Sequence, residues 1–256
     1  MSKTLIVYGT RPEYLKIKPL LKDNPSLHTL YIKQHVDIID FGDPTHSIDV
    51  ENKCENRLNS IFQQILLKTG QIISSYKNIV IQGDTATVAA TALAAYNLKK
   101  KIFYIEAGLR SFDLENPYPE EGYRQMVSRI AAVNFCPTDL SAQNLRNEKV
   151  LGEIFVTGNT ALDNLIDDKK GASYGKDILI TLHRNENLSI LSDWAAQIDK
   201  LARTNSRYKF IYPVHPNPSI KEAVKNTKHI IKVNPLEHRE FIKILKNCSI
   251  VITDSG

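Results

Sequence analysis

The feature that most constrains the fold of this 256-residue chain is an alternation of short apolar runs with longer amphipathic segments. In the first part of the chain, runs rich in β-branched residues occupy positions 4–8, 27–32, 78–82, 101–105, 132–136 and 153–157, and apolar residues recur at helical spacing over 12–23, 58–76 and 85–98. Such alternation is typical of βαβ units, in which helices cover both faces of a parallel sheet.

The alternation stops after Gly158 and restarts near residue 177. The polar residues 159–177 are typical of a linker with one short helix. Further on, strand-like runs at 177–183, 208–214, 229–233 and 249–254 alternate with helical patterns at 188–203, 219–226 and 237–247. We therefore predict an α/β protein of two Rossmann-like domains facing a cleft, the first over residues 1–165 and a smaller second one over residues 166–256.

Composition excludes several classes of protein. A hydrophobic content of 42% and a charged content of 24% are ordinary for a globular chain. The net charge of +5 suits an anionic substrate, but the lysines are scattered, so we predict no nucleic-acid partner. Without a signal-peptide pattern or an apolar run approaching the ~18 residues of a membrane span, we expect a cytoplasmic protein that does not enter membranes.

The three cysteines, Cys54, Cys136 and Cys248, are far apart and lack the spacing of metal ligands. We expect reduced thiols and no metal site.

The stretch from Glu106 to Arg124 carries the clearest chemical signal. Glu106 directly follows the run at 101–105, and Glu120 stands where a proline-containing loop gives way to a helical pattern. Ordered loops at strand ends are where α/β proteins place their active sites. The alternative is that Glu120 and Glu121 only favour a helix N-terminus through its dipole.

The turn after the first strand lacks the glycine pattern of dinucleotide-binding proteins, since only Gly9 is present. We therefore expect no nicotinamide or flavin cofactor. Arg11 and Lys16 flank the start of the next helix, where they would form a diphosphate clamp or serve as ordinary surface cations. Asp84, after the strand at 78–82, is either a helix N-cap or an acid/base group.

Two histidines follow neighbouring strand-like runs in the second half. His183 ends the run at 177–183, and His215 follows the run at 208–214. A lone histidine at a strand end is usually a structural hydrogen-bonding group, but two at equivalent ends favour a functional site.

Nine short motifs occur together in one order. They are GTRPE-x-x-K, QGDT, EAGLRS, PEEGYR, GNT-x-x-D, HRNEN, VHPNP, PLEH-x-x-F and the final TDSG. In this order the chain resembles the non-hydrolysing UDP-N-acetylglucosamine 2-epimerases over residues 6–256. The resemblance implies a GT-B-like fold and interconversion of UDP-N-acetylglucosamine and UDP-N-acetylmannosamine without metal or nicotinamide, for surface polysaccharide synthesis.

The resemblance also assigns site residues. Asp84, Glu106 and Glu120 match the acid/base carboxylates of the family, and His183 matches its catalytic histidine. The residues that match its substrate-binding groups are Arg11, Lys16, Arg124, His215, Ser255 and Gly256. Gln34, His35 and Arg184, with His215, match parts of a regulatory site for a second nucleotide sugar, and the family tends to be homodimeric.

The chain departs from the family pattern in three places. Tyr123 stands where Asn is usual, and Asn185 stands where Arg is common. The family also continues past the final Asp254-Ser255-Gly256 with a diphosphate-binding helix, so we expect an incomplete second domain and weak or no activity for these residues alone.

Three alternatives stay open at this point. A GT-B glycosyltransferase would share the fold but would need an acceptor. A hydrolysing epimerase would release free N-acetylmannosamine, although such enzymes depart from the GTRPE pattern kept here. A UDP-binding remnant would bind nucleotide without turnover.

Overall fold

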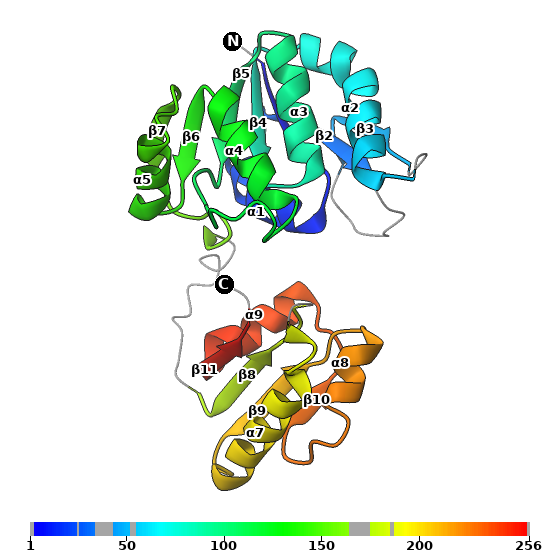
Figure 1. Ribbon diagram of the computed structural model, residues 1–256, viewed down its shortest axis with the longest axis vertical. Helices are drawn as coiled ribbons and strands as arrows, with labels where there is room; N and C mark the ends of the chain where they lie inside the picture. The colour runs from blue at the N-terminus through cyan, green and yellow to red at the C-terminus, as the bar shows by residue number, and fades with distance from the viewer. Residues whose placement is uncertain are drawn as a thin grey trace. The chain divides into compact units, whose positions relative to one another are not determined.

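The computed structural model describes residues 3–24, 26–33, 43–51, 55–163, 175–184 and 187–254. The chain divides into two compact units, residues 1–167 and residues 168–256, and each is described by itself (Figure 1). Each unit is built on a parallel sheet flanked by helices, which confirms the predicted α/β class. Among the described residues, no helix combines the length and apolar character needed to cross a membrane.

The first unit contains a seven-stranded parallel sheet in the order β3-β2-β1-β4-β5-β6-β7. The strands are β1 (Thr4–Tyr8), β2 (His28–Lys33), β3 (His46–Asp49), β4 (Asn78–Gln82), β5 (Lys101–Ile105), β6 (Val133–Cys136) and β7 (Glu153–Val156). The order of the strands reverses between β1 and β4. Open parallel sheets bind ligands beyond the carboxyl ends of their strands at such a switch point.

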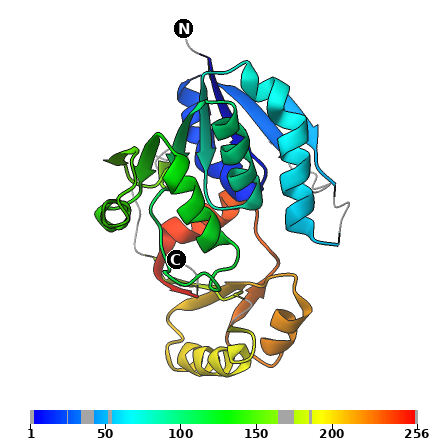
Figure 2. The ribbon, with the colours of Figure 1, turned by 45° about the horizontal axis from the view of Figure 1, so that its top comes forward.

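Helices cover both faces of this sheet. They are α1 (Arg11–Asp23), α2 (Arg57–Ser74), α3 (Ala86–Asn97), α4 (Glu120–Ile130) and α5 (Asp139–Asn147). Helix α1 packs through Ile17 on Ile6 and Tyr8, whereas α2, α3 and α4 lie side by side over the opposite face (Figures 1 and 2). Both faces are thus buried, which explains why the strands read as continuous apolar runs.

The sequence patterns predicted most of these elements, but they missed one strand and one helix. Helix α4 begins at Glu120, as predicted. Strand β3 was not predicted because its sequence, HSID, carries polar residues at three of four positions and is only half-buried at the sheet edge. Helix α5 was not predicted because it is short and buries only two apolar side chains, Ala142 and Leu145.

The second unit contains a four-stranded parallel sheet in the order β10-β9-β8-β11. Its strands are β8 (Asp177–Thr181), β9 (Lys209–Pro213), β10 (Ile231–Val233) and β11 (Cys248–Thr253), and its helices are α7 (Leu191–Thr204), α8 (Pro218–Ala223) and α9 (His238–Asn247). Helices α7 and α8 pack against one another over a core that includes Ile180 and Phe210. The strand order repeats that of β3-β2-β1-β4, so this sheet has its own switch point between β8 and β11.

Candidate active site

Glu106 lies immediately beyond β5 in a left-handed backbone conformation, with a φ of 66°. The Lys16 ammonium donates to its Oε2 atom at 2.6 Å, and the Gln82 amide donates to the same oxygen. The Asn159 amide donates to Oε1 at 3.2 Å. Three other segments of the first unit therefore hold this carboxylate in place, and its contact with Lys16 is charge-assisted.

Asp84 is held by an arginine that the sequence assigned to substrate binding. Arg124 donates from Nε to Asp84 Oδ2 at 2.8 Å, and its Nη2 atom lies 2.5 Å from the same oxygen. Burial acts to lower the pKa of Arg124, but the charge of Asp84 and their hydrogen bond outweigh it and raise the pKa. The N-cap of α3 is Thr85, not Asp84, so the structural alternative for Asp84 is wrong.

The adjacent glutamates at the start of α4 have different surroundings. Glu121 is fully buried and accepts hydrogen bonds from Ser111 N at 3.0 Å and from the Gln125 amide at 2.9 Å. Burial acts to raise the pKa of Glu121, but its hydrogen bonds, with that from Ser111 first, lower the pKa overall. Glu120 is only partly buried, yet its Oε2 atom is buried and has no hydrogen-bond partner within the described part of the chain.

The three candidate acid/base carboxylates lie at the same end of the first sheet. Asp84 and Glu106 follow the adjacent strands β4 and β5, and both raise the pKa of the buried Tyr104 beneath them, although burial itself is the larger cause. Glu120 lies one helical turn before Arg124, which reaches Asp84. The structure thus places Asp84 and Glu106 at the ends of neighbouring strands, and Glu120 on the helix whose Arg124 binds Asp84.

Two predicted cations differ in their surroundings. Arg11 is exposed at the first position of α1, beside the loop that follows β1. Lys16, one turn further along the helix, is engaged by Glu106. Of this pair, the exposed Arg11 is the better placed to meet a soluble anion.

In the second unit, His183 and His215 lie beyond the adjacent strands β8 and β9. Their rings are nearly parallel, 13° apart, with centroids separated by 6.1 Å. Asp254, at the end of β11, accepts hydrogen bonds from His183 N at 3.1 Å and from Arg184 N at 2.9 Å. Burial acts to raise the pKa of Asp254, but these hydrogen bonds, one from Asn187 and the charge of His183 lower it overall.

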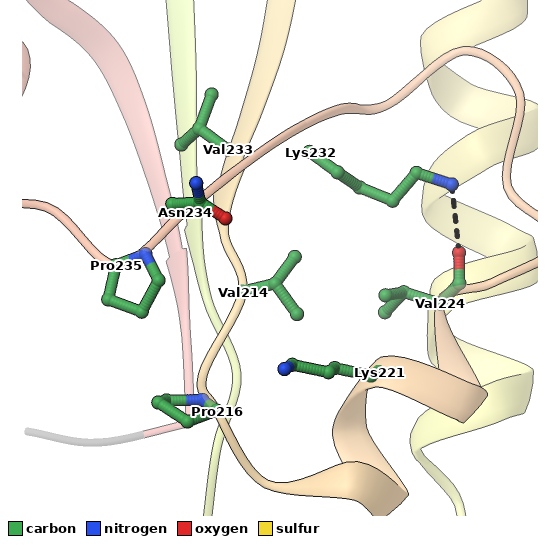
Figure 3. Close-up of a pocket in the computed structure, with 8 residues that line it drawn as sticks. All are labelled: Val214, Pro216, Lys221, Val224, Lys232, Val233, Asn234 and Pro235. Carbon is green, nitrogen blue, oxygen red and sulfur yellow. Dashed lines mark hydrogen bonds between the residues drawn. The ribbon is translucent and has the colours of Figure 1, made fainter.

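A pocket of about 580 Å³ lies between β9, β10 and α8 of the second unit (Figure 3). Its walls combine apolar side chains with two lysines and Asn234, and the amine of Lys221 points toward Val214 and Pro216. The other lining residues are Val224, Lys232, Val233, Asn234 and Pro235. The Lys232 amine is turned toward the end of α8, where it donates to Val224 O at 3.2 Å and to Thr227 O at 2.9 Å.

Several predicted site residues fall outside the described residues. These are Gln34 and His35 of the predicted regulatory site, and Ser255 and Gly256 of the predicted diphosphate loop. Arg184 is described, is exposed, and contributes its backbone N–H to the contact with Asp254. Over the described ranges, no group of three or more His, Cys, Asp or Glu side chains has the geometry of a metal site.

Sequence reasoning missed three residues that hold the candidate groups. Gln82 and Asn159 lie within the quoted motifs and support Glu106. Glu13 is buried beside the loop after β1. The spacing Thr10-x-x-Glu13 is a capping-box pattern and would have indicated the role of Glu13 in starting α1.

Comparison with known proteins identifies relatives over the whole chain. A family profile described as UDP-N-acetylglucosamine 2-epimerase matches residues 27–256. The UDP-N-acetylglucosamine 2-epimerase of Campylobacter jejuni is 36% identical, and the match covers 100% of this chain and 77% of that protein. The chain therefore spans about three quarters of the length of this relative.

Solved structures agree with these sequence matches. The crystal structure of UDP-GlcNAc 2-epimerase from Neisseria meningitidis bound to UDP-GlcNAc has a TM-score of 0.85 at 26% identity, over 99% of this chain and 78% of the other. The Methanocaldococcus jannaschii enzyme in complex with UDP-GlcNAc and UDP has a TM-score of 0.75 at 27% identity, over 99% and 79%. With the profile match and the Campylobacter relative, these likenesses show that the chain belongs to the UDP-N-acetylglucosamine 2-epimerase family.

Proposed function

We propose that this protein interconverts UDP-N-acetylglucosamine and UDP-N-acetylmannosamine by inverting the configuration at C2 of the sugar, a step that supplies surface polysaccharide precursors. The observation that carries the proposal is the grouping of Asp84, Glu106 and Glu120 at the carboxyl end of one parallel sheet. Family membership supports it, because the relatives are UDP-N-acetylglucosamine 2-epimerases and solved members hold UDP-GlcNAc.

The chemistry requires more than one acid/base group. The proton at C2 is not next to a carbonyl, so its direct removal would leave an unstabilised carbanion. Elimination avoids this, because the C1–O bond to UDP breaks as the C2–H bond breaks and a C1=C2 double bond forms. Protonation of C2 on the opposite face, with return of UDP to C1, then completes the inversion.

We assign roles to groups on this basis. Asp84, Glu106 and Glu120 are the proposed acid/base carboxylates, and His183 is a further catalytic group. Departure of the diphosphate needs cationic or hydrogen-bonding support. The proposed substrate-binding residues, for which the motif matches are the main support, are Arg11, Lys16, Arg124, His215, Ser255 and Gly256.

Incubation with UDP-N-acetylglucosamine alone in D₂O tests the proposal. We expect UDP-N-acetylmannosamine that carries one deuterium at C2, because the departing proton exchanges with solvent before the opposite face is protonated. Nuclear magnetic resonance measures both the new epimer and the label, and long incubation accumulates label even when turnover is slow.

None of the alternatives predicts UDP-N-acetylmannosamine labelled at C2. A glycosyltransferase would leave the sugar unlabelled at C2 in the absence of an acceptor. A hydrolysing epimerase would release free N-acetylmannosamine and UDP. A binding remnant would form no product in the incubation but would bind UDP in a separate calorimetric titration. Any of these three outcomes would contradict the proposal.

We also propose that the protein forms a homodimer through the face made by α2, α3 and α4. These neighbouring helices each expose an apolar side chain, with Leu67 75%, Tyr96 55% and Met126 53% exposed.

Light scattering tests the dimer. We expect it to give twice the chain mass of 29.0 kDa for the wild type, and the substitution Leu67→Glu to halve that measured mass. Leu140→Glu on α5, where Leu140 is 71% exposed, is the matched control and should leave the mass unchanged, whereas a monomeric wild type would refute the dimer.

A cytoplasmic location completes the proposal. Its support is that Cys136 and Cys248 are unpaired, as expected in a reducing compartment.

A further inference from the structure

We propose that Glu13 is a positioning residue, which couples the loop carrying Arg11 to the loop carrying Asp84. This inference rests on the proposed function. Glu13 lies in the first turn of α1 and is 3% exposed. Its two carboxylate oxygens face different loops, both at the switch point of the first sheet.

The two sets of contacts come from distant parts of the chain. The Oε2 atom accepts hydrogen bonds from Gly9 N at 2.6 Å and from Thr10 N at 3.0 Å, in the loop after β1. The Oε1 atom accepts one from Thr85 Oγ1 at 2.6 Å, in the loop after β4, 72 positions further along. One side chain therefore joins the two strands between which the strand order reverses.

Among these contacts, helix capping explains only the one with Thr10 N. The capping box needs the bond between the Glu13 side chain and the backbone of Thr10, and an exposed glutamate makes that bond equally well. Here burial raises the pKa of Glu13 against the opposing effect of Thr85 and the backbone donors, so the buried position costs free energy that capping does not require. Of the contacts that capping does not require, the one with Thr85 reaches a second loop.

The coupling has a consequence for the proposed reaction. Arg11 directly follows Thr10, and Asp84 directly precedes Thr85, so Glu13 determines how a candidate cation and a candidate acid/base group lie relative to each other. Small displacements of catalytic groups lower reaction rates steeply. We therefore expect loss of the Thr85 contact to affect turnover more than stability.

Thr85→Val tests the coupling, because it replaces the hydroxyl with a methyl group of similar size. Amide hydrogen exchange measures the response at Gly9 and Thr10, which belong to the other loop. We expect exchange there to accelerate about tenfold, the value of one hydrogen bond of about 1.4 kcal/mol. Thr85→Ser keeps the hydroxyl, including its N-cap contact with Val88 N, and should restore protection.

Thr69→Val is the matched control in the same unit. Thr69 is fully buried, and its hydroxyl donates to Ile65 O at 2.7 Å within α2. We expect this variant to lose comparable stability while leaving exchange at Gly9 and Thr10 unchanged. Equal protection of these two amides in wild type and Thr85→Val would overturn the inference.

Turnover provides an independent measurement. We expect Thr85→Val to lower kcat about tenfold and Thr69→Val to leave it unchanged. A wild-type chain without epimerisation would count against the proposed function, while the exchange experiment would still decide the role of Glu13. Normal kcat in Thr85→Val would refute the positioning role alone.

Discussion

Glu106→Gln is expected to lower the rate of epimerisation by about two to four orders of magnitude, the usual contribution of a general acid or base. The amide has nearly the shape of the carboxylate, so the fold should survive. It loses the ability to exchange a proton, and it replaces the charged partner of Lys16 with a neutral one. The measurement is kcat for conversion of UDP-N-acetylglucosamine, with deuterium incorporation at C2 as a second readout.

Glu115→Gln is the matched control for this substitution. Glu115 lies in the exposed loop that leads to α4, so the same chemical change there should alter kcat by less than about twofold. A Glu106→Gln variant that keeps more than about a tenth of wild-type activity would remove Glu106 from the acid/base groups.

Gly108→Ala is expected to lower the free energy of unfolding by about 2–5 kcal/mol, because it causes both overpacking and backbone strain. A Cβ atom at this position would lie 2.2 Å from Ser141 O and 2.8 Å from Ser141 C, and both are backbone atoms of α5. Gly108 also has a φ of 82°, a conformation that L side chains rarely adopt. Chemical denaturation, followed by a probe in the first unit, measures the change in the free energy of unfolding.

Gly122→Ala supplies the comparison for this second substitution. Gly122 lies in α4, and a Cβ atom there would meet nothing within 4 Å. Alanine is favoured over glycine in a helix interior by about 0.5–1 kcal/mol, so this variant should be slightly more stable than wild type. If the two alanine variants unfold at the same denaturant concentration, the close approach of Gly108 to α5 is not a source of destabilisation.

Much of the fold was predictable because strands buried on both faces of a parallel sheet require continuous apolar runs, which are visible in the local sequence. The runs at 4–8, 78–82 and 101–105 match β1, β4 and β5, since each strand is buried on both faces. The pattern fails where burial is incomplete. Strand β10 covers only Ile231–Val233 of the predicted run at 229–233, because the backbone N–H groups of residues 228–230 turn toward the Asp199 carboxylate instead.

The candidate site was predictable in its residues but not in its contacts. Motif and position identified Asp84, Glu106 and Glu120, because each lies at or near the carboxyl end of a strand or the start of a helix. Their partners depend on distance in space. Lys16 is 90 positions from Glu106, and no local pattern indicates that the two form an ion pair.

Local sequence patterns also fail to predict the contacts of the buried arginine, Arg110, that fixes the loop after Glu106. The Arg110 side chain is fully buried, lies 2.6 Å from Glu148 through Nε, and donates to Ser128 Oγ at 3.0 Å. The sequence shows only an arginine within EAGLRS. A buried guanidinium requires several acceptors, and these come from Ser128 in α4 and from Glu148 at the C-cap of α5, 18 and 38 positions further along the chain.

The neighbouring pair Glu120 and Glu121 shows how helix geometry separates two identical side chains. Successive residues of an α-helix point about 100° apart. Glu121 therefore anchors the backbone at Ser111, while Glu120 keeps a buried oxygen that has no partner among the residues the structure describes. Inserting one residue into the preceding loop would move Glu120 into the anchoring place of Glu121 and would move Glu121 into the place of Gly122. Loop length before this helix is therefore under as strict a constraint as the acidic residues themselves, and an alignment that shifts by one position here would exchange an anchor for a candidate reactive group.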